Sequence, residues 1–343
     1  MNIIYVEDCC EILDSKRVPI TASERKRGEY PYYGANGIQD YVSDYIFDDE
    51  LVLLAEDGGN FGSKERPIAY KVSGKCWVNN HAHVLKPRAC INVDYLCYAL
   101  MFYNVDGMVN GATRQKLTQA AMRKMQIPFR RMEEQVHIVD ELNRLVKIKE
   151  QRQQELILLD TLIKARFVEL FCNKGYPIIK WNDIFNTTTG KLDSNDAVED
   201  GKYPFFTCAK EASRIDDFAF DQEALLLAGN NAAGKYDVKY YKGKFNAYQR
   251  TYVLSLKNDW SYQLFRYQLE DKLVYLQQQS LGGLTKYLTM KILETLEFVV
   301  PPKIRQIEFE NFVAQVDKSK SAVKKALDET QLLFDSLMQE YFG

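Results

Sequence analysis

Two stretches of the chain carry apolar residues at the spacing of an amphipathic helix. Residues 129–174 and 303–342 contain neither proline nor glycine, the two main helix breakers. In both stretches apolar side chains recur at steps of three and four residues, which predicts one apolar stripe along each helix. The stripes comprise Ile138, Leu142, Leu145, Ile148, Leu156, Leu159, Ile163, Phe167 and Leu170, and then Phe309, Phe312, Val316, Val323, Leu333 and Leu337.

An apolar stripe must be covered by another apolar surface, and the stripe of each helix can pack against that of the other helix. The segments before the helices resemble each other, so the chain alternates domain, helix, domain, helix. This pseudo-symmetry predicts an antiparallel coiled coil, in which a 40-residue helix would extend roughly 60 Å. A helical hairpin that merely joins two domains is the alternative.

An internal repeat supports this alternation. Residues 28–33 (GEYPYY) recur as residues 201–206 (GKYPFF), and the apolar run 51–55 recurs as 224–228 at the same offset. Further on, Gly74-Lys75 matches Gly243-Lys244, and residues 111–114 match 283–286. The repeat predicts two copies of one domain. Because there are only two copies and the period is long, an open solenoid is disfavoured and a pseudo-two-fold molecule is favoured.

The middle of each copy has the pattern of β structure. Residues 51–55 and 224–228 are short apolar runs typical of buried strands, and residues 238–241 followed by Gly243-Lys244 predict a hairpin. Polar loops that differ between the copies follow, at residues 56–66 and 229–236, and a second divergent patch is 79–83 against 248–252. Asn, Gln and Arg in these loops have the paired donors and acceptors that read base edges. An ordinary solvated loop is the alternative for any one of them.

Composition bounds the setting of the protein. The 343 residues suffice for two compact domains and the helices, and 46% hydrophobic residues support buried cores without any run long enough to span a membrane. The first residues lack a signal peptide, and seven cysteines in an irregular set favour reduced thiols, so a cytoplasmic protein is expected. The net charge is −2, which gives no overall basic field for DNA. Weak DNA binding by the chain alone is predicted.

The motifs of common enzymes are missing. No Gly-Lys pair is followed by Ser or Thr, so a Walker loop is excluded, and the Pro301-Pro302 pair lacks the preceding residues of an adenine methyltransferase motif. Three histidines, at 81, 83 and 137, provide no nucleophile elbow arrangement. Cys76, His81, His83 and Cys90 could offer zinc two sulfurs and two nitrogens, but the spacing is not that of a known finger, and no metal site is predicted.

The ordered set of repeated motifs resembles a known family. The second half contains residues 176–181 (YPIIKW), the GKYPFFT run, residues 243–247 (GKFNA), residues 283–286 and the stretch 299–302 before Gln306. This pattern is similar to the DNA specificity subunit of Type I restriction-modification enzymes. The first half matches more loosely, since Trp181 has no tryptophan counterpart in residues 1–27.

The resemblance implies an α+β architecture of two pseudo-repeated mixed α/β target-recognition domains separated by two long helices packed as an antiparallel coiled coil. The expected segments are residues 1–130 and 174–302 for the domains and 131–173 and 303–343 for the spacer helices. Each domain would read one half of a bipartite asymmetric DNA target, and the helices would set the gap. Two modification subunits would dock on the helices, a restriction and translocase subunit would join for cleavage, and S-adenosylmethionine, ATP and Mg would bind those partners. The chain itself would be non-catalytic and hold no cofactor.

Residues for DNA contact are predicted from the divergent loops. They are Lys64, Arg66, Asn80, His81 and Arg114 in the first copy and Lys235, Gln249, Arg250 and Lys286 in the second. A coiled-coil scaffold that organises other proteins, or an orphan specificity subunit without restriction activity, is the alternative function.

Overall fold

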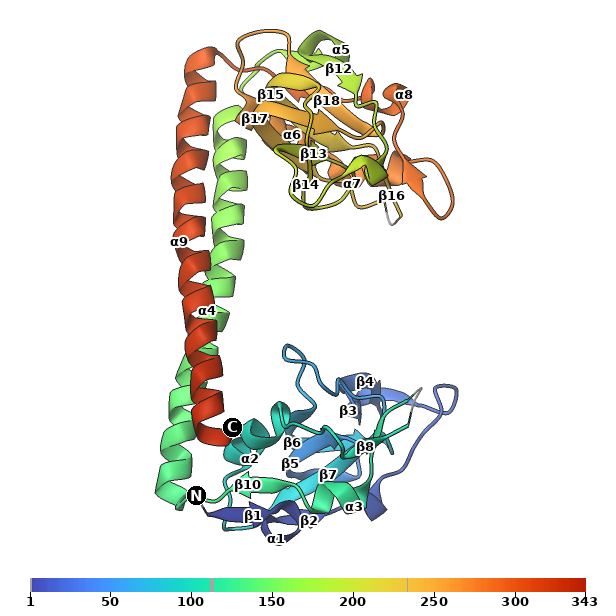
Figure 1. The fold of residues 1–343 in the computed structure, drawn as a ribbon, viewed down its shortest axis with the longest axis vertical. Coiled ribbons are helices and arrows are strands. Elements are labelled where there is room, and N and C mark those ends of the chain that lie inside the picture. The colour runs from blue at the N-terminus through green and yellow to red at the C-terminus, as the bar shows by residue number, and fades with distance from the viewer. Residues whose placement is uncertain (1, 112–113, 233) are drawn as a thin grey trace. The chain divides into compact units, whose positions relative to one another are not determined.

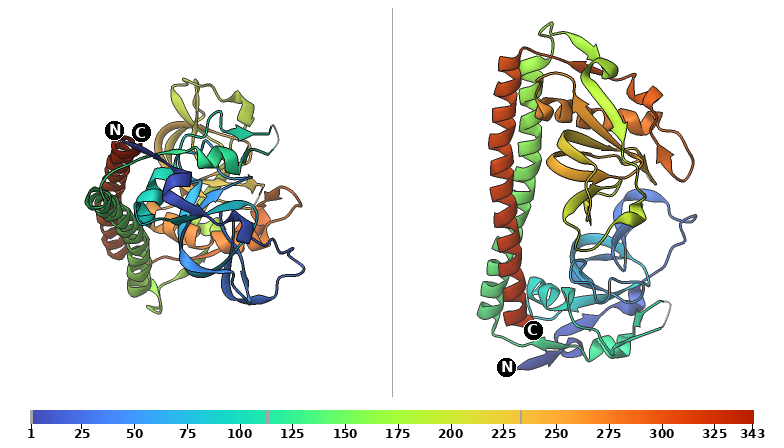
Figure 2. Two further views of the ribbon diagram at one scale, coloured as in Figure 1. Left: turned by 90° about the horizontal axis from the view of Figure 1, so that it is seen from below. Right: turned by 45° about the horizontal axis from the view of Figure 1, so that its top comes forward.

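A computed structural model describes residues 2–111, 114–232 and 234–343. The chain divides into two compact units, residues 1–153 with 325–343 and residues 154–324. Each unit contains one domain and half of each long helix, α4 (Met132–Phe171) and α9 (Lys303–Phe342). Within each unit, the segments of the two helices lie side by side and run antiparallel (Figure 1 and Figure 2). The predicted α+β class with two mixed domains and a helix pair is confirmed.

Unit 1 is built on a six-stranded mixed sheet of order β2-β7-β5-β6-β3-β4, in which β3 and β6 are parallel. The strands are β2 (Cys10–Ile12), β3 (Arg27–Gly34), β4 (Gly37–Val42), β5 (Phe47–Ala55), β6 (Ala69–Val78) and β7 (Ala82–Pro87). Two short ribbons join β1 (Ile3–Tyr5) to β10 (Gln126–Pro128) and β8 (Val109–Asn110) to β9 (Lys116–Leu117). The helices are α1 (Val6–Cys9), the 3-10 turn η1 (Asp14–Lys16), α2 (Val93–Met101) and α3 (Gln119–Arg123).

Unit 2 repeats this topology, with the order β12-β18-β15-β17-β13-β14 and a parallel β13–β17 pair. Its strands are β12 (Phe185–Thr189), β13 (Tyr203–Phe206), β14 (Ser213–Ile215), β15 (Phe220–Ala228), β17 (Val238–Ala247) and β18 (Thr251–Leu256). The ribbons are β11 (Ile178–Lys180) with β20 (Glu297–Val299), and β16 (Asn230–Asn231) with β19 (Lys286–Tyr287). The helices are α5 (Trp181–Ile184), η2 (Ser194–Asp196), α6 (Tyr262–Asp271), α7 (Leu273–Gln279) and α8 (Met290–Leu293).

The central strand of each sheet is buried on both faces. In β5, Val52 and Leu54 point into the core under α2, whereas Leu51 and Leu53 point into a second cluster on the other face. Because side chains alternate along a strand, a continuous apolar run fits only a strand that is covered on both sides. The apolar runs 51–55 and 224–228 are therefore strands, as predicted.

The expected hairpin at residues 238–244 is wrong. Strand β17 continues through Gly243, which pairs with Gln222 of β15 in an unbroken register. Gly243 has φ +129 and Gly74, at the equivalent place in β6, has φ +79. Both glycines supply a backbone conformation that other residues rarely adopt, and they supply it inside a strand instead of at a turn.

The apolar stripes of the long helices are confirmed with two corrections. Within unit 1, Ile138, Leu142 and Leu145 pack with Phe334, and within unit 2 Ile163 and Leu170 pack with Phe309 and Val316. However, Ile148 is 39% exposed and Leu333 is 51% exposed. At the C-terminal end of α9 the neighbouring Phe334 is buried instead, because it lies three heptads after the buried Val313 and so continues the same face of the helix, whereas Leu333 lies beside that face.

A buried glutamine fixes each domain to the helix that follows it. Gln135 of α4 accepts a hydrogen bond from the Asn92 amide at 2.8 Å, and Gln306 of α9 accepts one from the Ser261 amide at 2.9 Å. Asn92 and Ser261 are the N-caps of α2 and α6. The two domains therefore meet their helices through the same contact, although their surrounding sequences differ.

The N-terminal edge of unit 1 has a counterpart for the missing tryptophan. Trp181 is the first residue of α5, and Val6 is the first residue of α1; both are fully buried. The β1–β10 ribbon beside Val6 has the same register as the β11–β20 ribbon beside Trp181. A smaller apolar residue thus fills the same position in unit 1.

Candidate nucleic-acid interface

Three segments of unit 1 meet where the central strands end. The Glu56 amide, directly after β5, donates to the His81 carbonyl at 2.9 Å, and the Leu117 amide donates to the Glu56 carbonyl at 2.7 Å. These bonds bring the loop after β5, the turn between β6 and β7, and strand β9 to one place. The backbone thereby positions polar side chains that are far apart in the sequence.

Arg114 and His81 converge on one acidic residue at this place. Oδ1 of Asp57 lies 2.7 Å from Nδ1 of His81 and 2.6 Å from Nη2 of Arg114. Asn80 is exposed and lines, with His81, Arg114 and Arg25, a shallow pocket of about 350 Å³. Three of the five predicted contact residues of this copy therefore lie together.

Lys64 and Arg66 belong to another part of the unit 1 surface. Both are exposed, and Arg66 lines a separate pocket of about 600 Å³ together with Tyr33 and Tyr70. Asn36 and Asn60, which the sequence analysis did not single out, line the same pocket. The sequence offers a signal for each: Asn60 lies in the divergent loop 56–66, and Asn36 closely follows the repeated GEYPYY motif.

Unit 2 presents different side chains on the same backbone frame. The Gly229 amide donates to the Arg250 carbonyl at 2.8 Å, and the Leu288 amide donates to the Gly229 carbonyl at 2.8 Å. Gln249 and Arg250 are exposed in the turn between β17 and β18, at the positions of Asn80 and His81 in unit 1. Unit 2 thus replaces a histidine by a guanidinium at an equivalent turn.

The two predicted lysines of unit 2 lie around the short β16–β19 ribbon. Lys286 is the register partner of Asn231, whose side chain accepts from the Lys235 amide at 3.3 Å. Lys235 is exposed and Lys286 is half-buried. These lysines and the Gln249-Arg250 turn are linked through Gly229, which precedes β16.

The sequence register that matched residues 111–114 with 283–286 is off by one residue. Gly111 and Gly282 both have a left-handed backbone, and a Cβ on either would meet the carbonyl oxygen three residues later, that of Arg114 or Thr285. Arg114 is therefore equivalent to Thr285 and not to Lys286. Ala112 and Thr113 of this motif lie outside the described residues.

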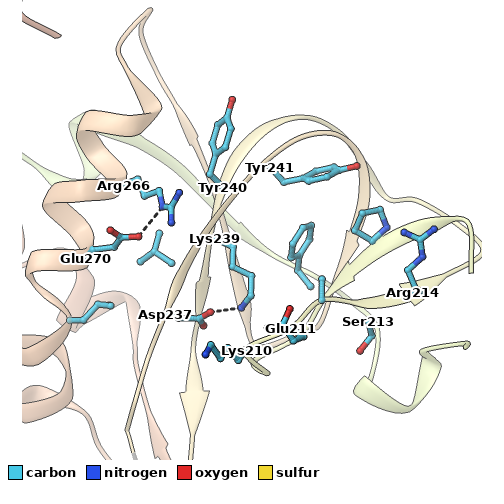
Figure 3. A pocket seen from close by; sticks show the side chains of 15 residues that line it. Lys210, Glu211, Ser213, Arg214, Asp237, Lys239, Tyr240, Tyr241, Arg266 and Glu270 are labelled. Atoms are coloured by element: carbon cyan, nitrogen blue, oxygen red, sulfur yellow. Dashed lines mark hydrogen bonds and ion pairs between the residues drawn. The ribbon is translucent and has the colours of Figure 1, made fainter. Parts of the chain in front are cut away.

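A groove in unit 2 adds residues that the sequence analysis missed. It has a volume of about 870 Å³ and lies between the β13–β14 hairpin, β17 and α6 (Figure 3). Nζ of Lys239 lies 2.5 Å from Asp237 and donates to the Ala209 carbonyl at 2.8 Å, which ties the loop after β13 to β17. Lys210 on that loop also lines the groove. In unit 1, Tyr70 occupies the position of Lys239 and donates to the carbonyl of Gly34, the last residue of β3.

A buried ion-pair network lies beneath the His81 turn in unit 1. Nδ1 of His83 lies 2.6 Å from Oδ2 of Asp14, and Nε2 lies 2.9 Å from the Leu117 carbonyl. Arg17 donates to Glu56 at 2.6 Å, and Lys116 lies 2.9 Å from the other oxygen of Glu56. Both ring nitrogens of His83 thus lie within hydrogen-bond distance of oxygen atoms.

The network determines the protonation of its carboxylates. Burial alone would raise the pKa of Asp14, but hydrogen bonds from His83, Gln119 and the Val84 amide outweigh it and hold that pKa below its ordinary value. Burial would also raise the pKa of Glu56. Hydrogen bonds from Lys116 and Arg17 outweigh the effect of burial, so the pKa of Glu56 is lowered as well. Both groups are therefore ionised at neutral pH.

The four residues weighed for zinc do not form a cluster. Cys76 is buried in one sheet-face cluster, Cys90 packs against the other, and His83 is bound to Asp14. Within the described residues, Asp14, Glu56 and His83 are the group close enough to approach a metal ion. Arg17 and Lys116 neutralise these carboxylates, so the arrangement is an ion-pair network. Across the ranges that the structure covers, no helix is long and apolar enough for a membrane span.

Two α+β domains of one topology, each followed by a long helix and each with a different polar surface at the same strand ends, define the class of the protein. The chain belongs to the family of Type I restriction modification DNA specificity domains, which it matches twice, over residues 1–158 and 173–330.

Individual relatives agree with this assignment. The chain is 34% identical over 154 residues to the Type I restriction enzyme EcoDI specificity subunit of Escherichia coli, a match that covers 43% of this chain and 33% of that protein. It is 36% identical over 143 residues to a putative type I restriction enzyme specificity subunit of Haemophilus influenzae, covering 42% and 37%. Each match spans about a third of the relative's length. The fold is similar to the crystal structure of a Type I restriction-modification system S subunit from M. genitalium, with a TM-score of 0.62, 15% identity, and coverage of 100% of this chain and 96% of that one.

Proposed function

We propose that this chain is the sequence-specific DNA-binding subunit of a Type I restriction-modification complex, in which each unit reads one half of a bipartite, asymmetric target. The observation that carries the proposal is the pairing of one backbone frame with two sets of side chains. Asn80 and His81 occupy the turn in unit 1, and Gln249 and Arg250 occupy it in unit 2. A symmetric scaffold gains nothing from this difference, whereas a reader of two unlike half-sites requires it.

The helices are proposed to set the gap between the half-sites. The proposed segments are residues 1–130 and 174–302 for recognition and 131–173 and 303–343 for spacing. Helices α4 and α9 each comprise 40 residues, and at about 1.5 Å per residue each extends roughly 60 Å, more than one turn of duplex at about 34 Å. Half-sites about one turn apart are therefore within reach of such a spacer.

The helix surfaces also support the docking of modification subunits. In unit 2, Ile157, Leu158 and Val168 of α4 are 58%, 56% and 55% exposed. Three large apolar side chains exposed on one helix segment support a protein partner there. Such partners would supply the phosphate contacts that a chain of net charge −2 lacks. The proposal assigns methyl transfer, with its S-adenosylmethionine, and any ATP- and Mg-dependent cleavage to those partners, and a non-catalytic role in the cytoplasm to this chain.

Methylation mapping tests the proposal. The chain is co-expressed with the modification subunit encoded beside it in a host without methylated adenine, and every modified adenine is located by sequencing. One split motif is the expected result. A Gln249→Ala/Arg250→Ala variant should then make one half of the motif degenerate and leave the other half intact. A stable complex that methylates no site, or a variant that changes both halves, would contradict two independent readers.

A further inference from the structure

An aspartate lies at the centre of the predicted reading surface of unit 1. The Asp57 side chain is only 18% exposed, whereas His81 and Arg114, which it contacts, are 33% and 59% exposed. An acidic group beside DNA repels phosphate, so its presence among contact residues calls for a physical reason. The geometry of its two contacts supplies one.

Asp57 fixes the hydrogen-bonding character of His81. Because the carboxylate oxygen lies 2.7 Å from Nδ1, that nitrogen must carry the hydrogen and donate it. In the neutral ring Nε2 is then a bare acceptor, held in one orientation. The 3.4 Å approach of Arg114 to Nδ1 is a packing contact between two donors, which both point to the same carboxylate.

Asp57 also fixes the guanidinium of Arg114. Nη2 donates to Oδ1 of Asp57 at 2.6 Å, and the guanidinium lies over Gly58. A Cβ on Gly58 would come within 3.3 Å of Nε and Nη2, and its φ of +62 is a glycine conformation. With one nitrogen bound to Asp57, the remaining N–H groups of an exposed side chain are left to donate.

We propose that Asp57 is a positioning residue for base recognition in unit 1, holding Arg114 as a donor toward guanine O6 and N7 and His81 as an acceptor toward the amino group of a neighbouring base. This inference rests on the proposed function. Asp57 is not itself the reader, since Oδ1 already accepts two hydrogen bonds and the side chain is mostly covered. Fixing both side chains before binding reduces the entropy lost on contact.

Unit 2 lacks this device and provides an internal control. Asn230, which pairs with Tyr287, is equivalent to Asp57, which bridges to Lys116. The residues equivalent to His81 and Arg114 are Arg250 and Thr285. No carboxylate of the described residues holds Arg250 in this way, so removal of Asp57 must affect one half-site alone.

The test uses the chain in complex with its modification subunit and oligonucleotides based on the mapped motif. Fluorescence anisotropy gives the ratio of Kd for the cognate duplex to Kd for duplexes with one changed base, at each position of both half-sites. The variants are Asp57→Asn, Asp57→Asn in a His81→Ala/Arg114→Ala background, and Asp44→Asn. Asp44 is exposed and precedes Phe47, at the opposite end of β5 from Asp57, so it is a control of equal charge.

Asp57→Asn should lower selectivity at one or two adjacent positions of a single half-site by about tenfold, while affinity for unrelated duplex rises because a negative charge is lost. Asp44→Asn should leave selectivity unchanged. In the His81→Ala/Arg114→Ala background, Asp57→Asn should cost no further selectivity, because the groups it positions are gone.

Two results would overturn the proposal. One is an increase of affinity in Asp57→Asn with selectivity intact, which would make Asp57 a surface charge only. The other is a further loss of selectivity in the His81→Ala/Arg114→Ala background, which would mean that Asp57 reads a base directly or supports the fold. Thermal melting of each variant distinguishes direct base reading by Asp57, which leaves the melting temperature unchanged, from support of the fold, which lowers the melting temperature on substitution. If the unchanged complex shows no selectivity at all, the proposed function fails instead of this inference.

Discussion

Replacement of Asp14 by alanine should loosen unit 1 beneath its reading turn and leave unit 2 intact. The Asp14 side chain is 4% exposed and accepts hydrogen bonds from His83 at 2.6 Å, Gln119 at 2.9 Å and the Val84 amide at 2.9 Å. Asp14→Ala leaves the buried His83 ring and the buried Val84 amide without this acceptor. Breaking a buried ion pair in this way costs about 3–5 kcal/mol.

Hydrogen–deuterium exchange of the full chain measures this loss in each unit separately. A cost of 3–5 kcal/mol corresponds to faster exchange of the Leu85 amide of β7, which Asp14 does not contact, by between about a hundredfold and a few thousandfold. The equivalent Leu254 amide of β18 serves as the internal reference. Asp49→Ala is the matched control, since Asp49 pairs with Lys86 at 2.6 Å but is 36% exposed. A surface pair of this kind is worth about 0–1 kcal/mol.

The effect should depend on pH in a stated direction. The pKa of Asp14 is lowered in the folded chain from its ordinary 3.8, and that of Glu56 from 4.5. The stabilisation is therefore fully present above these values and is lost as the pH falls through the lower pKa values of the folded state. The difference between Asp14→Ala and the unchanged chain should shrink below pH 3.8. Exchange of β7 within about threefold of the unchanged chain at neutral pH, or equal acceleration of β18, would refute the reasoning.

Three further predictions follow from single contacts. Gln306→Leu leaves the buried Ser261 amide and Pro301 carbonyl unpaired, so thermal unfolding monitored by circular dichroism should show a loss of about 2–4 kcal/mol, and a loss below 0.5 kcal/mol would contradict the role of this contact. Arg250→Ala should reduce selectivity at one half-site by about tenfold in the anisotropy assay, with equal effects on both half-sites as the opposing result. Leu284 is 95% exposed, so Leu284→Ser should leave the melting temperature unchanged; a fall in melting temperature would mean that the side chain packs in the folded chain.

The sequence was most informative where one local signal decides the structure. The absence of proline and glycine over two long stretches was sufficient to predict α4 and α9, and two apolar runs were sufficient to predict β5 and β15. The hairpin at Gly243 was wrong because a glycine after a polar strand has the same local pattern whether the chain turns or continues. Only the pairing of Gly243 with Gln222 distinguishes these cases.

The site could be predicted only in part, because its geometry comes from contacts across the fold. Turn residues such as His81 and Arg250 are predicted contacts because the two copies differ at these positions. Asp14 and His83, in contrast, are 69 residues apart in the sequence. Asp57 lies in the divergent loop 56–66 but is not among the predicted contacts, and its hydrogen bond joins it to Arg114, 57 residues later in the sequence. No pattern within one segment indicates either pair.

The comparison of the two units explains how one frame accommodates two different surfaces. His83 in unit 1 and Tyr252 in unit 2 bind equivalent carbonyls, those of Leu117 at 2.9 Å and Leu288 at 3.1 Å. Backbone hydrogen bonds and a buried glutamine maintain the frame in both units, so the frame does not depend on which side chains occupy the strand ends. Tyr252 reaches its carbonyl with a hydroxyl, whereas the second ring nitrogen of His83 is bound to the buried Asp14. A change of polar residues at this position therefore requires a matching change in the supporting network, and altered recognition should involve such pairs together.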